Sequence, residues 1–174
     1  MRQSKALVFK IMNEPDHIFA AKYVLSVIST KDIVAFADRK LSEGKYSDTY
    51  LDIIDADLKV WSQLAPLLEM ALKESGLIIP DEEQAVWIML KYHIGLIESG
   101  SVNPKEQFGR LLQDIGKFDL TKGITKYVGD NVGIELMYGW FYEDYESDSA
   151  INEGIKSECA KWLELYAAKP QVIN

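Results

Sequence analysis

Hydrophobic residues recur along most of this chain at intervals of three and four residues, which is the spacing of one face of an α-helix. No stretch of useful length alternates between apolar and polar residues, as a half-buried strand would. The sequence therefore predicts an all-α fold. The helical stripe is clearest in one segment, where it consists of Trp61, Leu64, Ala65, Leu68, Ala71 and Leu72.

Residues that favour helix ends divide this pattern into separate helices. Asn103 is expected to cap a helix that starts at Pro104, and Pro80 is expected in the first turn of a helix that runs to about Ser99. Glycines are expected to end three of the helices, at Gly44, Gly76 and Gly100. The expected helices open at Pro15, at Ser29 or Thr30, at Ser47, near Trp61, at Pro80, at Asn103, near Val132 and near Ala150.

Two of these helices carry further expectations. The helix from 80 to 99 is expected to be central and the most buried, because Lys91 is the only charged residue between Val86 and Ile97. In the segment from 61 to 75, Pro66 removes a backbone hydrogen bond, so we expect a kink or a break near Ala65.

The C-terminal quarter is expected to form two helices. The first, over 132–145, would be capped by Asp130 and Asn131, and the second would cover 150–168. The second helix has an apolar stripe of Ile155, Cys159, Trp162, Leu163 and Tyr166. No linker or repeat divides the chain, so residues 1–174 are expected to form a single compact domain of about eight or nine helices around the buried central helix.

Composition narrows the class of protein. The chain has 174 residues, 48% of them hydrophobic and 26% charged, which is the composition of a globular domain. Cys159 is the single cysteine, so the chain has no intramolecular disulfide and no cysteine-rich zinc site. The longest run without a charged residue, from Val60 to Leu68, is too short to span a membrane. A cytoplasmic location is expected.

The net charge of −8 is unevenly distributed. Residues 1–129 hold 18 acidic and 16 basic residues, whereas residues 130–174 hold 9 acidic residues and 3 lysines. The last quarter therefore carries −6. A disordered acidic tail would lack aromatic residues, but this segment is rich in tyrosine, so we expect it to be folded. A chain this acidic is not expected to bind nucleic acid directly.

The histidines are the first candidates for catalysis or metal binding. Glu14 and His17 have the spacing of a helical di-iron ligand pair, but no second copy of the motif exists, because Leu90 stands three residues before His93. His93 lies in the apolar central helix, where a hydrogen-bonded core histidine is a better interpretation than a catalytic base. No metal, cofactor or catalytic residue is predicted.

Other motifs are also better explained by structure. Cys159 lies on an apolar stripe, as a buried thiol would. The segment Gly129–Gly133 resembles a phosphate loop only in its glycines, and Asp130 would repel a phosphate. The small basic groups, such as Arg39 and Lys40, are expected at solvated helix ends.

The remaining feature is the segment Tyr138–Asp148, in which aromatic and acidic residues alternate. If the helix runs to 145, one side is apolar and part of it lies in the core, with Ile134, Tyr138, Phe141 and Tyr145. The opposite side carries Glu135, Gly139, Tyr142, Glu143 and Glu146. This side is either an ordinary solvated face or a protein-binding surface, because tyrosine and tryptophan often dominate binding energy and carboxylates attract basic partners.

An acidic, all-helical chain with tyrosines set among carboxylates resembles the bacterial immunity proteins that neutralise nuclease toxins of colicin and contact-dependent inhibition systems. The segment Ser29–Gly44, STKDIVAFADRKLSEG, is similar to helix and glycine-turn units in bacterial helical families of this kind. The resemblance implies an inhibitor that covers the basic, nucleic-acid-binding surface of a toxin.

The expected function is that of a non-catalytic immunity protein that binds a basic toxin, such as a nuclease, without contacting nucleic acid or membrane. The alternatives are a helical adaptor or scaffold with a non-toxin partner, or an enzyme with a cleft around His93. The expected partner-binding residues are Glu135, Trp140, Tyr142, Glu143, Asp144, Tyr145, Glu146 and Asp148.

Overall fold

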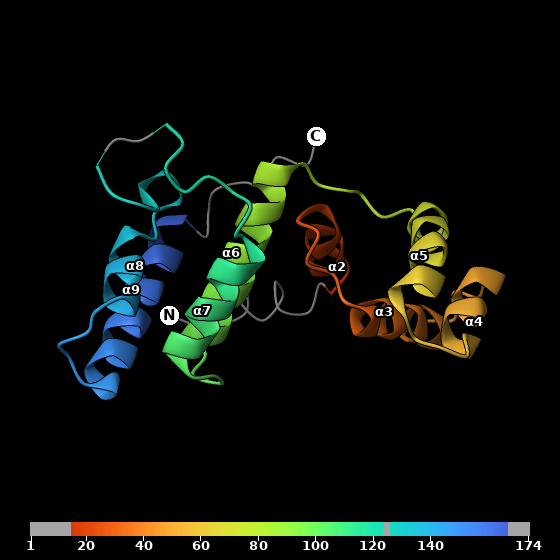
Figure 1. Cartoon of the computed structure of the whole chain (residues 1–174), viewed down its shortest axis with the longest axis horizontal. Coiled ribbons are helices and arrows are strands. Elements are labelled where there is room, and N and C mark those ends of the chain that lie inside the picture. The colour runs from red at the N-terminus through yellow and green to blue at the C-terminus, as the bar shows by residue number, and fades with distance from the viewer. Residues whose placement is uncertain (1–14, 124–125, 167–174) are drawn as a thin grey trace.

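The chain is helical throughout the part that the structure, a computed structural model, describes: residues 15–123 and 126–166 (Figure 1). These residues form eight α-helices and one 3₁₀ helix and contain no strand, so the predicted all-α fold is confirmed. The elements are α2 (Pro15–Val24), α3 (Thr30–Ser42), α4 (Asp48–Asp55), α5 (Trp61–Ser75), α6 (Glu82–Glu98), α7 (Pro104–Asp114), η1 (Asp130–Val132), α8 (Glu135–Phe141) and α9 (Asp148–Tyr166).

Two hydrophobic clusters hold the helices together. The larger lies among α6, α7, α8 and α9, and the smaller lies among α3, α4 and α5. Helix α2 stands between these two groups of helices (Figure 1) and contributes to both, with Ala21 in the larger cluster and Phe19 in the smaller one. Leu25, the residue after α2, also belongs to the larger cluster. Because one helix belongs to both clusters, the described helices form one domain with two lobes, the α3–α5 lobe and the α6–α9 lobe.

The prediction of a buried central helix is confirmed for α6. Most of its residues between Ala85 and Ile97 are buried, and it packs against α2, α7 and α9. Asp81 caps its start, because the Asp81 side chain accepts a hydrogen bond from the Gln84 amide and the Gln84 side chain accepts one from the Asp81 amide. Pro80 therefore precedes the cap, and its predicted place in the first turn is wrong.

Polar residues cap three other helices as predicted. The Ser29 side chain accepts a hydrogen bond from the Asp32 amide, Ser47 accepts one from the Tyr50 amide, and Asn103 accepts one from the Glu106 amide. Each satisfies a backbone donor that the helix leaves unpaired.

Helix α5 differs from its prediction at Trp61, and of the two outcomes expected at Pro66, a kink or a break, it excludes the break. It is continuous through Pro66, so a break near Ala65 does not occur. The carbonyl that Pro66 leaves without its helical donor belongs to Ser62, and both residues are exposed, where water can take the place of that donor. Trp61, expected in the apolar stripe, is 51% exposed, whereas Leu64 and Leu68 are buried.

The predicted helix over 132–145 is wrong at both ends. Gly129 and Gly133 adopt left-handed conformations with φ of 88° and 73°, which confine residues 130–132 to a 3₁₀ turn before α8. Asp130 does not cap α8; its carboxylate accepts a hydrogen bond from the Tyr127 amide. At the other end α8 stops at Phe141, and residues 142–147 form a loop.

Polar side chains explain this early stop. The Glu143 carboxylate accepts a hydrogen bond from the Tyr145 amide at 2.9 Å, and the Ser147 hydroxyl accepts one from the Ala150 amide at 3.2 Å. These local bonds compete with the helical ladder and start α9 at Asp148, two residues before its predicted position. The last two residues predicted for this helix, 167–168, and Glu14 lie outside the described residues.

Candidate protein-binding surface

The loop that joins α8 to α9, residues 142–147, is the exposed part of the acidic aromatic segment, and we call it the α8–α9 loop. It links two helices that pack against each other through Met137 and Cys159, whose sulfur atoms are 3.7 Å apart. Both helices belong to the larger hydrophobic cluster. The loop is therefore anchored to the core at its two ends.

Tyr145 is the most exposed large hydrophobic side chain in the described part of the chain, with 97% of its surface accessible. The prediction that it shares a helical face with Ile134 is wrong, because α8 ends before Tyr145 is reached. Tyr142 is 58% exposed and leans on its aromatic neighbours, with ring centroids 4.7 Å from Tyr138 and 4.9 Å from Phe141. The loop thus presents one supported tyrosine and one that projects into solvent.

The loop also carries three carboxylates, next to these tyrosines in the sequence. Asp144 and Glu146 are exposed and Glu143 is half-buried, and none of the three forms an ion pair with any residue that the structure describes. Asp148, the first residue of α9, lies 3.5 Å from the Lys105 ammonium of α7, so part of its charge is already compensated. Within this surface, the unpaired negative charge therefore belongs to Glu143, Asp144 and Glu146.

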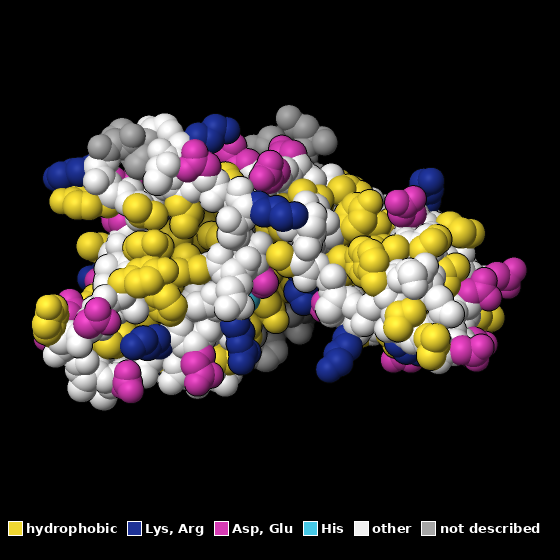
Figure 2. Space-filling model, viewed as in Figure 1, with side chains coloured by type: hydrophobic (Ala, Val, Ile, Leu, Met, Phe, Trp, Pro, Cys, Tyr) yellow, Lys and Arg dark blue, Asp and Glu magenta, His cyan; other side chains and the backbone are white. Residues whose placement is uncertain are grey.

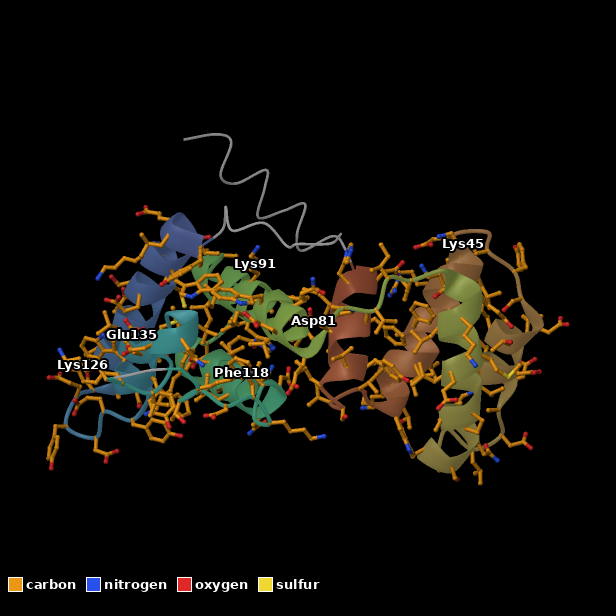
Figure 3. All side chains as sticks on the ribbon, turned by 90° about the horizontal axis from the view of Figure 1, so that it is seen from above. Lys45, Asp81, Lys91, Phe118, Lys126 and Glu135 are labelled. Atoms are coloured by element: carbon orange, nitrogen blue, oxygen red, sulfur yellow. The ribbon has the colours of Figure 1, made fainter. Side chains whose placement is uncertain are left out.

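Two predicted contact residues do not belong to this surface. The Trp140 indole ring is half-buried against α9, where a Cβ at Gly154 would overlap it, so most of its area is used inside the protein. Glu135 begins α8, at the far end of that helix from the loop (Figure 3). One of its carboxylate oxygens is buried with no hydrogen-bond donor among the described residues. The structure brings together the other six: Tyr142, Glu143, Asp144, Tyr145, Glu146 and Asp148.

The sequence did not indicate one exposed leucine near the start of α8, outside this surface. Leu136 of α8 is 58% exposed, on a helix too short to have a full buried face. Hydrophobic side chains are visible at the surface of the lobe that contains α7 and α8 (Figure 2). In the sequence Leu136 stands between Glu135 and Met137, and helical periodicity alone does not show whether it is buried or exposed.

The prediction that His93 is a hydrogen-bonded core histidine is confirmed. The residue is 3% exposed, its Nε2 lies 2.9 Å from Asp114 Oδ2, and its Nδ1 lies 2.6 Å from Gln107 Nε2. Both ring nitrogens are occupied by protein groups, so neither is available to a substrate in this arrangement.

The other candidates for chemistry are also structural. Cys159 is fully buried as predicted, and burial raises the pKa of its thiol to about 12, so it is not a nucleophile at neutral pH. Among residues 15–123 and 126–166, no group of three or more His, Cys, Asp or Glu side chains is arranged to hold a metal ion.

One of the basic groups departs from its prediction. Lys40 was expected at a solvated helix end but is 1% exposed, and its ammonium pairs with Asp16 of α2 and lies 3.6 Å from Glu43. It also lies 5.2 Å from the centroid of the Phe36 ring. Lys40 therefore joins α3 to α2 instead of contributing to a surface patch.

Comparison of the chain with models of protein families, with curated proteins and with solved structures found no match. No helix in the described part of the chain is both long enough and apolar enough to cross a membrane.

Proposed function

We propose that this protein is a non-catalytic immunity protein that binds and neutralises a basic protein toxin through the α8–α9 loop. The observation that supports this proposal best is the 97% exposed Tyr145 on a loop whose carboxylates, at 143, 144 and 146, have no cationic partner among the described residues. The toxin class that suits such a surface is a nuclease domain, because the nuclease's own nucleic-acid-binding surface is basic.

Two physical effects support this assignment. A tyrosine gives a large, amphipathic contact with few rotatable bonds, and such residues can contribute about 2 kcal/mol or more to a protein interface. Unpaired carboxylates attract a cationic partner at long range and raise the association rate. The same surface would repel nucleic acid, which agrees with an inhibitor that competes for the toxin.

The proposal also covers the kind of organism and the cell compartment in which the protein acts. We infer a bacterial protein that acts in the cytoplasm, where a toxin delivered by contact-dependent growth inhibition would meet its substrate. The adaptor alternative would use the same surface with a partner that is not a toxin. The enzyme alternative is less well supported, since both nitrogens of His93 are engaged.

The direct test is co-expression with the product of the neighbouring gene, followed by purification of the complex and an assay of the toxin's nuclease activity. We expect a basic toxin that co-purifies with this protein and loses its activity. A neighbouring protein that binds without being a toxin would favour the adaptor, and a neighbour that does not bind would contradict the proposal.

The surface itself is tested by reversing its charge. Glu143→Lys with Glu146→Lys should lower the association rate about tenfold or more at low salt, because it removes the electrostatic attraction. Glu153→Lys with Glu164→Lys, at exposed positions of α9, changes the net charge equally and is the matched control. Equal association rates for the two double variants would contradict the assigned surface. Tyr145→Ala should mainly raise the dissociation rate.

A further inference from the structure

A second exposed apolar surface lies on the other lobe. Leu51 of α4 is 44% exposed, Leu58 of the following connection is 60% exposed, and Trp61 at the start of α5 is 51% exposed. We call this surface the α4–α5 edge, and it also includes Asp52, Asp55 and Asp57, which are all exposed. Figure 2 shows acidic and hydrophobic side chains interspersed at this end of the molecule.

The fold does not require apolar residues at these positions. The smaller cluster is built from other residues of the same helices. They are Tyr50 and Ile53, on a different side of α4 from Leu51, and Leu64 and Leu68, which come later in the stripe of α5 that Trp61 begins. The N-cap of α5 is Val60, which makes no side-chain hydrogen bond, although a serine or aspartate there would stabilise the helix. Val60 is therefore apolar where both solvent and helix capping favour a polar residue, and Trp61 is apolar at an exposed position of the first turn.

The charge of the edge is negative and uncompensated. None of Asp52, Asp55 and Asp57 forms an ion pair with a residue in the described part of the chain. The nearest lysine in sequence, Lys59, is used elsewhere, because its ammonium donates hydrogen bonds to the carbonyl groups of Ile53, at 3.1 Å, and of Ile54. There it stabilises the C-terminal end of α4 and leaves the three aspartates available.

We propose that the α4–α5 edge is a docking site for a basic, amphipathic segment of a partner protein. Apolar side chains of that segment would cover Trp61 and Leu58, and its lysines or arginines would pair with the three aspartates. A second copy of this chain suits the edge less well, because a two-fold contact would place aspartates against aspartates. This proposal does not depend on the proposed function, since the edge and the α8–α9 loop lie on different lobes.

The test is an NMR titration of the isotope-labelled full chain with a synthetic amphipathic helical peptide made of leucine and lysine. We expect saturable shifts at the Trp61 indole N–H and at backbone amides from 51 to 62. Oligolysine and a leucine–glutamate peptide are the controls. Oligolysine should bind at least about tenfold more weakly, because the apolar contact contributes to affinity, and the acidic peptide should not bind.

Variants locate the site. Trp61→Ser should weaken binding of the leucine–lysine peptide about tenfold, as should Asp52→Lys with Asp55→Lys, while Glu153→Lys with Glu164→Lys should change it less than about twofold. Glu143→Lys with Glu146→Lys should leave this peptide binding intact. A failure of the docking proposal can therefore be distinguished from a failure of the proposed function, because the two are tested on different surfaces.

Three outcomes of the peptide titration would overturn the proposal. They are shifts confined to the α8–α9 loop, equal binding of oligolysine and the leucine–lysine peptide, and the absence of any saturable shift. Concentration-dependent shifts at the edge without peptide would also overturn it, because they would identify a second copy of the chain as the occupant.

Discussion

Gly154 and Gly139 illustrate how differently two helical glycines can be constrained. At Gly154 of α9 the Trp140 ring occupies the space that a Cβ would need, whereas a Cβ at Gly139 of α8 would have no neighbour within 4 Å. The first glycine allows two helices to approach closely, and the second has no packing reason to be glycine. Because Gly154 has no side chain, the Trp140 ring can pack against α9, so it is half-buried and contributes little to the α8–α9 loop.

Alanine substitutions should therefore have opposite effects at these two positions. Gly154→Ala should lower the free energy of unfolding by about 1–3 kcal/mol, because Trp140 must move. Gly139→Ala should raise it by about 0.5–1 kcal/mol, since alanine is the better helix former. Urea denaturation measures both. A Gly154→Ala protein as stable as Gly139→Ala would show that Trp140 is not packed as described.

The ion pair between Lys40 and Asp16 is a second residue-scale feature with consequences for stability. Partial burial on its own would raise the pKa of Asp16, but hydrogen bonds from Lys40 and from Arg39, at 2.5 Å, outweigh it and lower the pKa below its ordinary value of 3.8. A carboxyl group with a lowered pKa stabilises the folded protein above its unfolded-state pKa, and this contribution disappears as the pH falls through the folded-state value.

Asp16→Asn should lower the free energy of unfolding by about 1.5–3 kcal/mol at pH 7, because it weakens a charged hydrogen bond and leaves the buried Lys40 ammonium poorly compensated. The difference from the wild type should begin to shrink as the pH falls below about 3.8, where Asp16 of the unfolded chain takes up a proton, and should be smallest once the pH has passed the lowered folded-state pKa. Asp38→Asn is the control, because Asp38 is exposed on α3 and has no ion pair within the described residues. A pH-independent difference would contradict this assignment.

At the scale of elements, the first turns of α3 and α5 are capped differently. Ser29 and Asp32 form a reciprocal capping box at α3, while Val60 precedes α5 without a side-chain hydrogen bond. Val60 has the extended backbone of an N-cap, with φ of −104° and ψ of 154°, so a polar residue would fit there without rearrangement. The apolar residue therefore costs α5 stability that a serine would restore.

Val60→Ser should raise the free energy of unfolding by about 1 kcal/mol, and Ser29→Ala should lower it by a similar amount. Thermal and urea denaturation of the two variants measure the effect. If Val60→Ser destabilises the protein instead, Val60 contributes to packing within the chain. The α4–α5 edge would then be less available to a partner than its exposure indicates.

For the whole molecule, the shared helix α2 is the feature that decides how the two lobes behave. Phe19 of α2 is buried in the smaller cluster and stacks on Phe36 with ring centroids 4.1 Å apart, while Leu25 is buried in the larger cluster. Lys45, in the α3–α5 lobe, and Glu135, in the other lobe, lie toward opposite ends of the molecule (Figure 3). The lobes can unfold separately only if α2 leaves one of its clusters.

We therefore expect one cooperative thermal transition, with calorimetric and van't Hoff enthalpies that agree. Phe19→Ala should lower the free energy of unfolding by about 3–5 kcal/mol and should keep the transition single. Differential scanning calorimetry measures both. Two resolved transitions, with only one of them shifted by Phe19→Ala, would show that the lobes fold independently.

Local features of this chain follow from the sequence. The helical class, the caps at Ser29, Ser47 and Asn103, and the burial of α6 depend on spacing and on bonds between residues a few positions apart. The same holds for Cys159 and His93, whose burial was predicted from the apolar residues around them on their own helices. The fact that Asp114 and Gln107 are the partners of His93 was not predictable, since both belong to another helix.

The candidate surfaces depend on local hydrogen bonds that compete with the helix and on contacts between distant residues. Tyr145 became exposed because the side chains of Glu143 and Ser147 end one helix and start the next, and Trp140 became half-buried because α9 presents a glycine to it. Lys40 was expected to be exposed but is buried, and Trp61 was expected on a buried stripe but is exposed. Both differ for the same reason, because a helical face is buried only where a neighbour covers it. Periodicity identifies the faces of a helix, and the packing of helices far apart in sequence determines which faces remain open to a partner.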